Sequence, residues 1–167
     1  MASNQNKILN HEEIQHKIKR IAYQIYETYV DEEEIVIAGI ASGGLELAKK
    51  INDTMREIAD INTQLCEVKI DKEQLLKPIE TSIDKDGYQN KAIVLVDDVL
   101  NSGGTLIYGV KHFLNVPIKK IKTVVLVDRN HKRYPVKADF KGISLSTSLQ
   151  EHVSVVFEEG NDAVYLN

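Results

Sequence analysis

Two adjacent carboxylates, Asp97 and Asp98, stand directly after the apolar run Ile93–Val96 and before a short polar turn. Two such groups at the end of a strand repel each other and lose hydration, a cost that is typical of a binding or catalytic site. Vicinal hydroxyl groups of a sugar can donate hydrogen bonds to such a pair. The sequence therefore predicts that Asp97 and Asp98 bind the hydroxyls of a ribose.

The turn that follows combines glycine with hydroxyl and amide side chains and leads into a helical segment. Its residues are Asn101, Ser102, Gly103, Gly104 and Thr105. The first backbone N–H groups of a helix have no partner within the helix and attract anions, and glycine lets the backbone approach a phosphate closely. The order of acids, turn and helix predicts a site for a sugar phosphate. The turn is not a P-loop, because no Gly-Lys-Ser/Thr triplet follows the glycines.

These groups need a scaffold that carries them at the ends of strands. Apolar strands expected at 35–38, 92–96 and 123–127 alternate with helices expected at 45–59 and 106–114. This alternation predicts an α/β fold with a central, mostly parallel sheet flanked by helices. Ligands of such sheets bind beyond the carboxyl ends of the strands. The turn after the first of these strands therefore joins the candidate site, with Ala41, Ser42, Gly43 and Gly44.

The remaining segments are expected to frame the sheet. The pattern of residues 10–30 predicts an amphipathic helix, and Asn10 with Glu13 is expected to form a capping box at its start. Residues 71–90 are polar and uneven and predict a long mobile loop, and residues 128–148 predict an irregular, basic stretch. Short strands are expected at 63–70, 153–157 and 163–166.

Length, charge and cysteine content limit the classes of protein to which this chain can belong. The chain has 167 residues, with 21 Lys and Arg against 25 Asp and Glu, and a formal net charge of −4. This length, without a visible linker or repeat, predicts a single domain over residues 1–167. The lone Cys66 excludes a disulfide framework within the chain, and no apolar run reaches the ~20 residues of a membrane helix, so a cytoplasmic setting is expected. The acid excess argues against general coating of nucleic acid.

The run from Ile93 to Thr105 resembles the signature with which type I phosphoribosyltransferases bind phosphoribosyl pyrophosphate (PRPP). It has four apolar residues, two acids, two apolar residues and a Ser-Gly turn that ends in threonine. Residues 37–49 resemble the strand and pyrophosphate loop of that family. Residues 125–142 resemble part of its hood, the small region that covers the base, expected here at about 128–167 with the N-terminal helix. This hood is most similar to that of PyrR, the pyrimidine operon attenuator and uracil phosphoribosyltransferase family.

The resemblance implies a type I phosphoribosyltransferase fold and a role for each site residue. Asp97 and Asp98 would be the catalytic carboxylates and would hold the ribose hydroxyls, partly through Mg²⁺. The 5-phosphate would bind at residues 101–105. The pyrophosphate would bind at the N–H groups of residues 41–44, whose first peptide bond can be cis in relatives. The base would lie against the hood, at Asp128, Arg129, Phe140 and Lys141, with Phe140 stacked on it.

The implied reaction is displacement of pyrophosphate from PRPP by a nitrogen of a nucleobase, with a pyrimidine such as uracil favoured. Its transition state has oxocarbenium character, so positioning and charge stabilisation would supply most of the catalysis. Residues 71–90 would close over the site and exclude water. The resemblance also implies a homo-oligomer.

Departures from the family pattern keep alternatives open. Residues 41–44 lack the Lys and Arg of PyrR relatives, Gly104 stands where those relatives carry Arg, and Asn101 stands where purine-specific relatives place an aspartate as general base. The alternatives are a catalytically weak regulator of the PyrR type that senses PRPP or a nucleotide, and a phosphoribosyltransferase for hypoxanthine or xanthine. RNA binding is not favoured, because the net charge is negative and no RNA-binding motif with interleaved aromatic residues is present.

Overall fold

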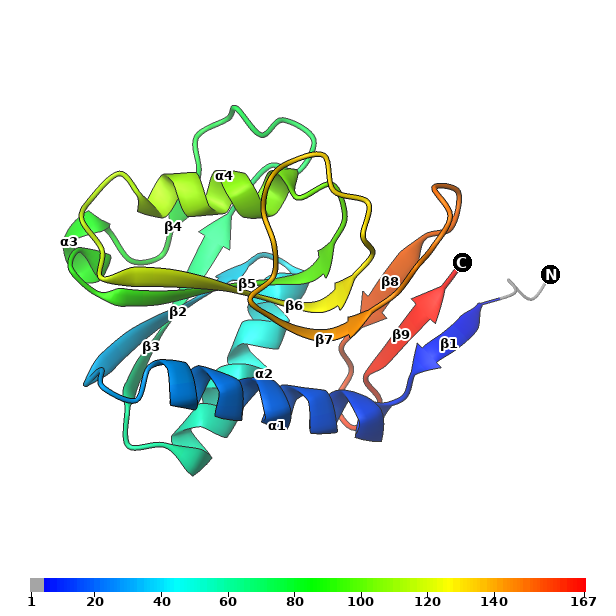
Figure 1. The fold of residues 1–167 in the computed structure, drawn as a ribbon, viewed down its shortest axis with the longest axis horizontal. Coiled ribbons are helices and arrows are strands. Elements are labelled where there is room, and N and C mark those ends of the chain that lie inside the picture. Colours follow the sequence, from blue (N-terminus) through cyan, green and yellow to red (C-terminus); the bar gives the residue numbers. More distant parts are fainter. Residues whose placement is uncertain (1–4) are drawn as a thin grey trace.

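A six-stranded sheet forms the centre of the computed structural model, in the order β4-β3-β2-β5-β6-β7 (Figure 1). The structure describes residues 5–167, so residues 1–4 of the expected domain lie outside the described part. The strands are β2 (Glu34–Ile40), β3 (Asn62–Lys69), β4 (Glu80–Thr81), β5 (Ala92–Leu100), β6 (Lys120–Asp128) and β7 (Phe140–Ser144). All neighbouring strands are parallel except β3 and β4, which confirms the expected mostly parallel α/β sheet.

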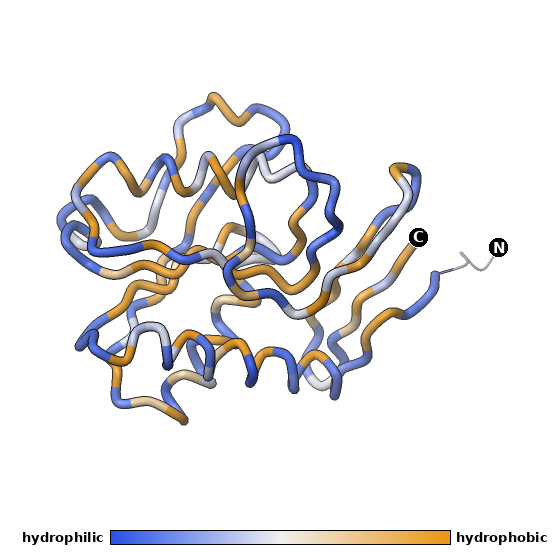
Figure 2. Tube along the Cα trace, in the orientation of Figure 1, coloured by the Kyte–Doolittle hydropathy of each residue, from blue (hydrophilic) through white to orange (hydrophobic). Residues whose placement is uncertain are grey.

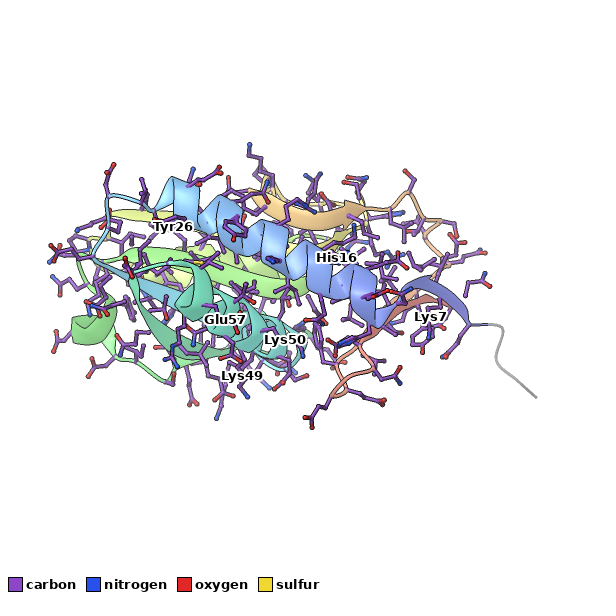
Figure 3. All side chains as sticks on the ribbon, turned by 90° about the horizontal axis from the view of Figure 1, so that it is seen from below. Lys7, His16, Tyr26, Lys49, Lys50 and Glu57 are labelled. Carbon is purple, nitrogen blue, oxygen red and sulfur yellow. The ribbon has the colours of Figure 1, made fainter. Side chains whose placement is uncertain are left out.

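Helices cover both faces of this sheet. The helices α1 (His11–Thr28) and α2 (Gly43–Ile58) pack on one face, and α4 (Gly104–Phe113) packs on the other. Figure 3 shows α1 and α2 side by side, with the labelled Lys49 and Glu57 on the outer side of α2. Because both faces are covered, β2, β5 and β6 each contain an unbroken apolar run, at residues 35–38, 92–96 and 124–127. Apolar residues are orange along the trace in Figure 2.

The helix α1 begins and packs as its sequence predicts. The side chain of Asn10 accepts a hydrogen bond from the amide of Glu13 at 2.9 Å, which satisfies one of the free donors of the first turn. The side chains spaced by three or four residues on the inner face are fully or almost fully buried: Ile14, Ile18, Ile21 and Ile25. This burial holds α1 against the sheet.

A second, antiparallel sheet in the order β1-β9-β8 stands beside the carboxyl ends of the central strands (Figure 1). Its strands are β1 (Asn6–Leu9), β8 (Val153–Val156) and β9 (Ala163–Leu166). The buried carboxylate of Asp162 connects this sheet to α1 and α2. It accepts a hydrogen bond from the side-chain amide of Gln15 in α1 at 2.8 Å and lies 3.3 Å from Lys50 Nζ in α2. The region 128–167 is thus divided, since β7 belongs to the main sheet and β8 and β9 to the small one.

Two expected irregular stretches contain regular structure. Residues 71–90 include β4 and the short helix α3 (Lys85–Tyr88), and residues 128–148 include β7, so the expectation that 71–90 is a loop throughout was wrong. The ring of Tyr88 is buried against Phe113 of α4, with 4.9 Å between centroids, and this tertiary contact fixes α3. Among residues 5–167, no helix is long and apolar enough to cross a membrane.

Candidate functional site

The acid pair lies inside β5, which continues to Leu100 rather than ending at Val96. Asp97 is only 3% exposed, and its Oδ1 accepts the amide of Asp98 at 2.9 Å. Burial raises the pKa of Asp97 to about 7; the positive charge of Lys72 opposes this shift and the negative charge of Asp98 adds to it. A bound cation or hydrogen-bond donor would therefore stabilise the ionised form of the Asp97 carboxylate.

The turn between β2 and α2 packs directly on the acid pair. A Cβ atom at position 43 would collide with the carboxylate of Asp98, and one at position 44 would lie 2.6 Å from Val96 O. Only glycine fits at these two positions, and this close approach places the first amides of α2 beside Asp98. The Ala41–Ser42 peptide bond is cis, which the resemblance had allowed for. The structure thus brings residues 41–44 and the acid pair together.

The turn between β5 and α4 presents backbone amides to the same region. Gly103 has φ +87°, a left-handed conformation that glycine adopts without strain, and α4 begins at Gly104. The amide of Gly104 donates to Ser102 Oγ at 3.2 Å, whereas the amides of Ser102, Gly103 and Thr105 have no acceptor within residues 5–167. A cavity of about 60 Å³ opens here; its lining includes Lys72, Asp97, Asn101, Ser102, Gly103 and Thr105. The amides and the cavity suit a phosphate group.

Three of the four expected base-binding residues, Asp128, Arg129 and Lys141, lie at or near the end of β6. Asp128 is buried at the end of β6, and its Oδ2 lies 3.6 Å from Lys141 Nζ. Arg129 is 9% exposed, and its guanidinium donates to Asn101 Oδ1 at 2.9 Å and to Thr147 Oγ1 at 3.1 Å. Arg129 therefore connects the phosphate turn to the hood instead of presenting free donors.

Phe140 is not brought to this site. It begins β7, opposite Val124 in the middle of β6, and its half-buried ring packs against the apolar core on the side of α1 and α2. The expected stacking on a base does not fit this position, because the carboxyl ends of the strands lie further along β6 and β7.

The structure places Lys72, which the sequence interpretation missed, at the acid pair, and it leaves Leu149 exposed on a loop of the hood. Lys72 Nζ lies 3.5 Å from Asp97 Oδ1, and Leu149 is 86% exposed on the loop after β7 that Arg129 holds. Lys72 could have been found, because it follows β3 and the ends of parallel strands meet at one edge. No sequence pattern marks Leu149, because the position of its loop depends on the hydrogen bonds that Arg129 donates to Ser148 and Glu151.

The acid pair fits a magnesium ion that the substrate would help to bind. Within residues 5–167, no group of three or more His, Cys, Asp and Glu residues could hold a metal ion. Magnesium, however, is commonly bound by one or two carboxylates, with waters and substrate oxygens completing its octahedral shell. Asp97, which lines the cavity, and Asp98, which lies against Gly43, supply that number of carboxylates.

A sheet with a separate hood, a twin-acid strand and two amide-rich turns defines a class of protein that binds phosphorylated sugars. Comparison with known families makes this specific, because the model of the phosphoribosyl transferase domain matches residues 4–159. The chain belongs to the phosphoribosyltransferase family. Among curated relatives, Bifunctional protein PyrR of Corynebacterium glutamicum is 34% identical over 176 residues, which cover 96% of this chain and 91% of that protein. Bifunctional protein PyrR of Streptococcus suis is 31% identical, covering 89% of each chain.

Solved structures share the fold at lower identity. The hypoxanthine phosphoribosyltransferase of Trypanosoma cruzi superposes with a TM-score of 0.76 at 16% identity and covers 95% of each chain. A hypoxanthine-guanine phosphoribosyltransferase of Bacillus anthracis superposes with a TM-score of 0.70 at 22% identity, covering 84% of this chain and 82% of that one. These likenesses establish the type I phosphoribosyltransferase fold.

Proposed function

We propose that this protein transfers the ribose 5-phosphate of PRPP to a nucleobase and releases pyrophosphate, with a pyrimidine such as uracil as the favoured acceptor. One observation carries the proposal: the turn at residues 41–44 packs on the acid pair, and Asp97 of this pair lines a small cavity together with the turn at residues 101–105. The curated relatives named PyrR, similar over most of the chain, support the choice of a pyrimidine.

The proposed reaction needs positioning more than covalent help from the protein. A ring nitrogen of the base forms a bond to C1 of the ribose, the bond from C1 to pyrophosphate oxygen breaks, and pyrophosphate leaves with the electron pair. The base loses its N–H proton to solvent. Asp97 and Asp98 would orient the ribose through its hydroxyls, and the amides of Ser102, Gly103 and Thr105 would fix the 5-phosphate.

Magnesium bound with the substrate would neutralise negative charge on the leaving pyrophosphate. Asp97 and Asp98 would hold it, since Asp97 lines the cavity and Asp98 is its neighbour in β5. Asp98 faces Gly43, so the same carboxylate also borders the turn where the pyrophosphate would lie.

The hood would cover the base with the loop that contains Leu149. Arg129 holds this loop through the carbonyl oxygens of Ser148 and Glu151, and it holds Asn101 through the side-chain oxygen. An asparagine amide held in this way cannot accept a proton from a purine ring, which favours a pyrimidine. An exposed leucine on a fixed loop offers an apolar surface for a flat base.

Pyrophosphate release from PRPP with uracil, hypoxanthine, xanthine and orotate tests the proposal. Release with uracil is the expected result, and a protein that binds PRPP but reacts with none of the four bases would contradict turnover. The double variant Asp97→Asn with Asp98→Asn should lose PRPP binding while its circular dichroism spectrum stays unchanged. Wild-type affinity for PRPP in that variant would contradict the ribose assignment.

A second candidate function is a regulator that binds PRPP or a nucleotide and turns over slowly. The cavity beside Ala41 and Ser42 favours it, because its lining sets three carboxylates against two lysines. These residues are Glu67, Asp71, Glu80, Lys69 and Lys77. A net negative wall weakens binding of pyrophosphate. A titration of pyrimidine leader RNA on filters, with and without nucleotide, separates this function from simple base salvage.

The proposal includes a homo-oligomer in the cytoplasm. An association of subunits could cover large apolar side chains that are well exposed in the single chain: Val30, Leu76 and Leu114. The single, buried Cys66 suits a reducing compartment. Light scattering coupled to size-exclusion chromatography tests the assembly, and a monomer at micromolar concentration would contradict it.

A further inference from the structure

The segment between β3 and β4 places one lysine at the acid pair. Lys72 Nζ lies 3.5 Å from Asp97 Oδ1, and Lys72 lines the same cavity as Ser102 and Thr105. It is the only lysine or arginine among the residues that line this cavity. A ligand that enters the cavity therefore meets the ammonium of Lys72 directly.

Hydrogen bonds of Asp71 fold the segment into a turn and pair its second lysine, Lys77. Asp71 Oδ1 accepts the amides of Glu73 and Gln74, both at 3.0 Å, and its Oδ2 lies 3.0 Å from Lys77 Nζ. Lys77 is thereby paired within its own turn. Lys72 is the cation of this turn that contacts Asp97.

A contact further along the segment holds the turn over α4. A Cβ atom at position 104 would lie 2.8 Å from Leu75 Cδ1 and 3.2 Å from the ring of Tyr134. Leu75 and Tyr134 therefore meet above Gly104. This packing of Leu75 anchors the otherwise exposed segment that carries Lys72 beside the phosphate turn.

Lys72 is more than a counter-ion of Asp97. Its side chain is 45% exposed, whereas that of Asp97 is 5% exposed, so the ammonium stands at the open side of the ion pair. An ammonium has three donors, and the contact with Asp97 uses one of them. Within residues 5–167 the remaining donors have no acceptor, Lys72 lines the cavity whose turn suits phosphate, and residues 41–44 carry no cation.

We propose that Lys72 is a substrate-binding residue whose ammonium donates to phosphate oxygens of PRPP, and that it supplies the positive charge that residues 41–44 lack. This assignment rests on the proposed function. Substrate brings phosphate and pyrophosphate groups to a pair of carboxylates, so a cation on the segment between β3 and β4 stabilises the bound anions. The same ammonium neutralises Asp97 when no substrate is bound.

The test compares Lys72→Met and Lys72→Arg with the matched control Lys77→Met, which removes a lysine of the same segment that is paired with Asp71. Isothermal titration in the presence of Mg²⁺ measures the affinity of each variant for PRPP and for ribose 5-phosphate. Lys72→Met should weaken PRPP binding at least about tenfold, the loss typical of a hydrogen bond to a charged group. Lys72→Arg should retain most of the affinity, and Lys77→Met should stay within about twofold of wild type, below the change that loss of one such bond produces.

The two ligands identify the phosphate that Lys72 binds. Loss of affinity for both assigns the contact to the 5-phosphate, and loss for PRPP alone assigns it to the pyrophosphate; either result supports the proposal. Wild-type or tighter binding of PRPP by Lys72→Met overturns the assignment of Lys72 and leaves the proposed function intact. If the wild-type protein binds neither ligand, the proposed function falls and the assignment falls with it.

Discussion

Arg129 Nη1 donates a hydrogen bond to Asn101 Oδ1 at 2.9 Å and thereby connects the hood to the phosphate turn. The other donors of the guanidinium reach Thr147 Oγ1 and the carbonyl oxygens of Ser148 and Glu151. One buried side chain thus fixes the loop at 145–152 relative to residues 101–105. The hood and the phosphate site are expected to lose order together when this side chain is changed.

Replacing Arg129 with lysine should destabilise the protein by about 2–4 kcal/mol, because a lysine cannot make the same fork of hydrogen bonds and leaves buried acceptors unpaired. Amide hydrogen exchange should rise in residues 145–152 and in residues 101–105. Chemical denaturation and exchange measured by mass spectrometry check the two effects. Arg133→Lys, at an exposed position of the neighbouring loop, is the control and should change neither quantity. Faster exchange in only one of the two segments would contradict the connection.

Asp97→Asn should stabilise the protein without Mg²⁺ at pH 8 while it abolishes PRPP binding. Burial raises the pKa of Asp97 from its ordinary value of 3.8 to about 7, so the folded state holds the proton of this carboxyl group more tightly than the unfolded state does. The free energy of unfolding therefore falls as pH rises from about 4 to about 7. Above pH 7 the buried carboxyl group is ionised, and the loss of stability that this ionisation causes is complete. At pH 8 the free energy of unfolding of Asp97→Asn should exceed that of wild type by on the order of 2–4 kcal/mol.

Thermal and chemical denaturation in EDTA at pH 4 and pH 8 check this expectation. Below pH 4 the carboxyl group is protonated in both states, so Asp97→Asn and wild type should differ little. The exposed Asp60, changed to Asn, serves as control and should show no gain at pH 8. An Asp97→Asn protein that is less stable than wild type at pH 8 would show that the carboxylate contributes to the unliganded fold.

The main sheet and its helices could be predicted because each rests on a strong local signal. The apolar runs of β2, β5 and β6 are buried on both faces, and the inner face of α1 repeats every three to four residues. The short elements carry no such period. Helix α3 has four residues, and its formation depends on the burial of Tyr88 against Phe113, which are far apart in the sequence. Strand β7 likewise forms because it pairs with β6.

The candidate site was predictable where a motif is continuous in the chain. Asp97, Asp98 and the glycine turns lie within short runs, and the structure brings these runs together. The hood was harder, because its contacts join distant segments. Phe140 has the expected type for a stacking residue, but the pairing of β7 with β6 places its ring in the core. Lys72 was missed because its segment has no period, although it directly follows a parallel strand.

Gly104→Arg should open the segment that carries Lys72. A side chain at this position would occupy the space that Leu75 and Tyr134 share, with the first atom already 2.8 Å from Leu75 Cδ1. Hydrogen exchange in residues 71–79 should therefore increase, and limited proteolysis should cut there first. Leu75→Ala should remove part of this conflict, so the double variant should be less destabilised than the sum of the two single variants predicts. Additive effects would contradict a shared space.

Leu149→Ala and Phe140→Ala should affect different properties, and the contrast tests which side chain of the hood meets the base. Phe140 packs in the core, so its truncation should cost about 2–3 kcal/mol of unfolding free energy, less than for a fully buried phenylalanine. Leu149 is 86% exposed, so its truncation should leave stability within about 0.5 kcal/mol of wild type. In an assay of pyrophosphate release, Leu149→Ala should raise the KM for the base severalfold and leave the KM for PRPP unchanged. An unchanged KM for the base in Leu149→Ala would exclude this leucine from the base site.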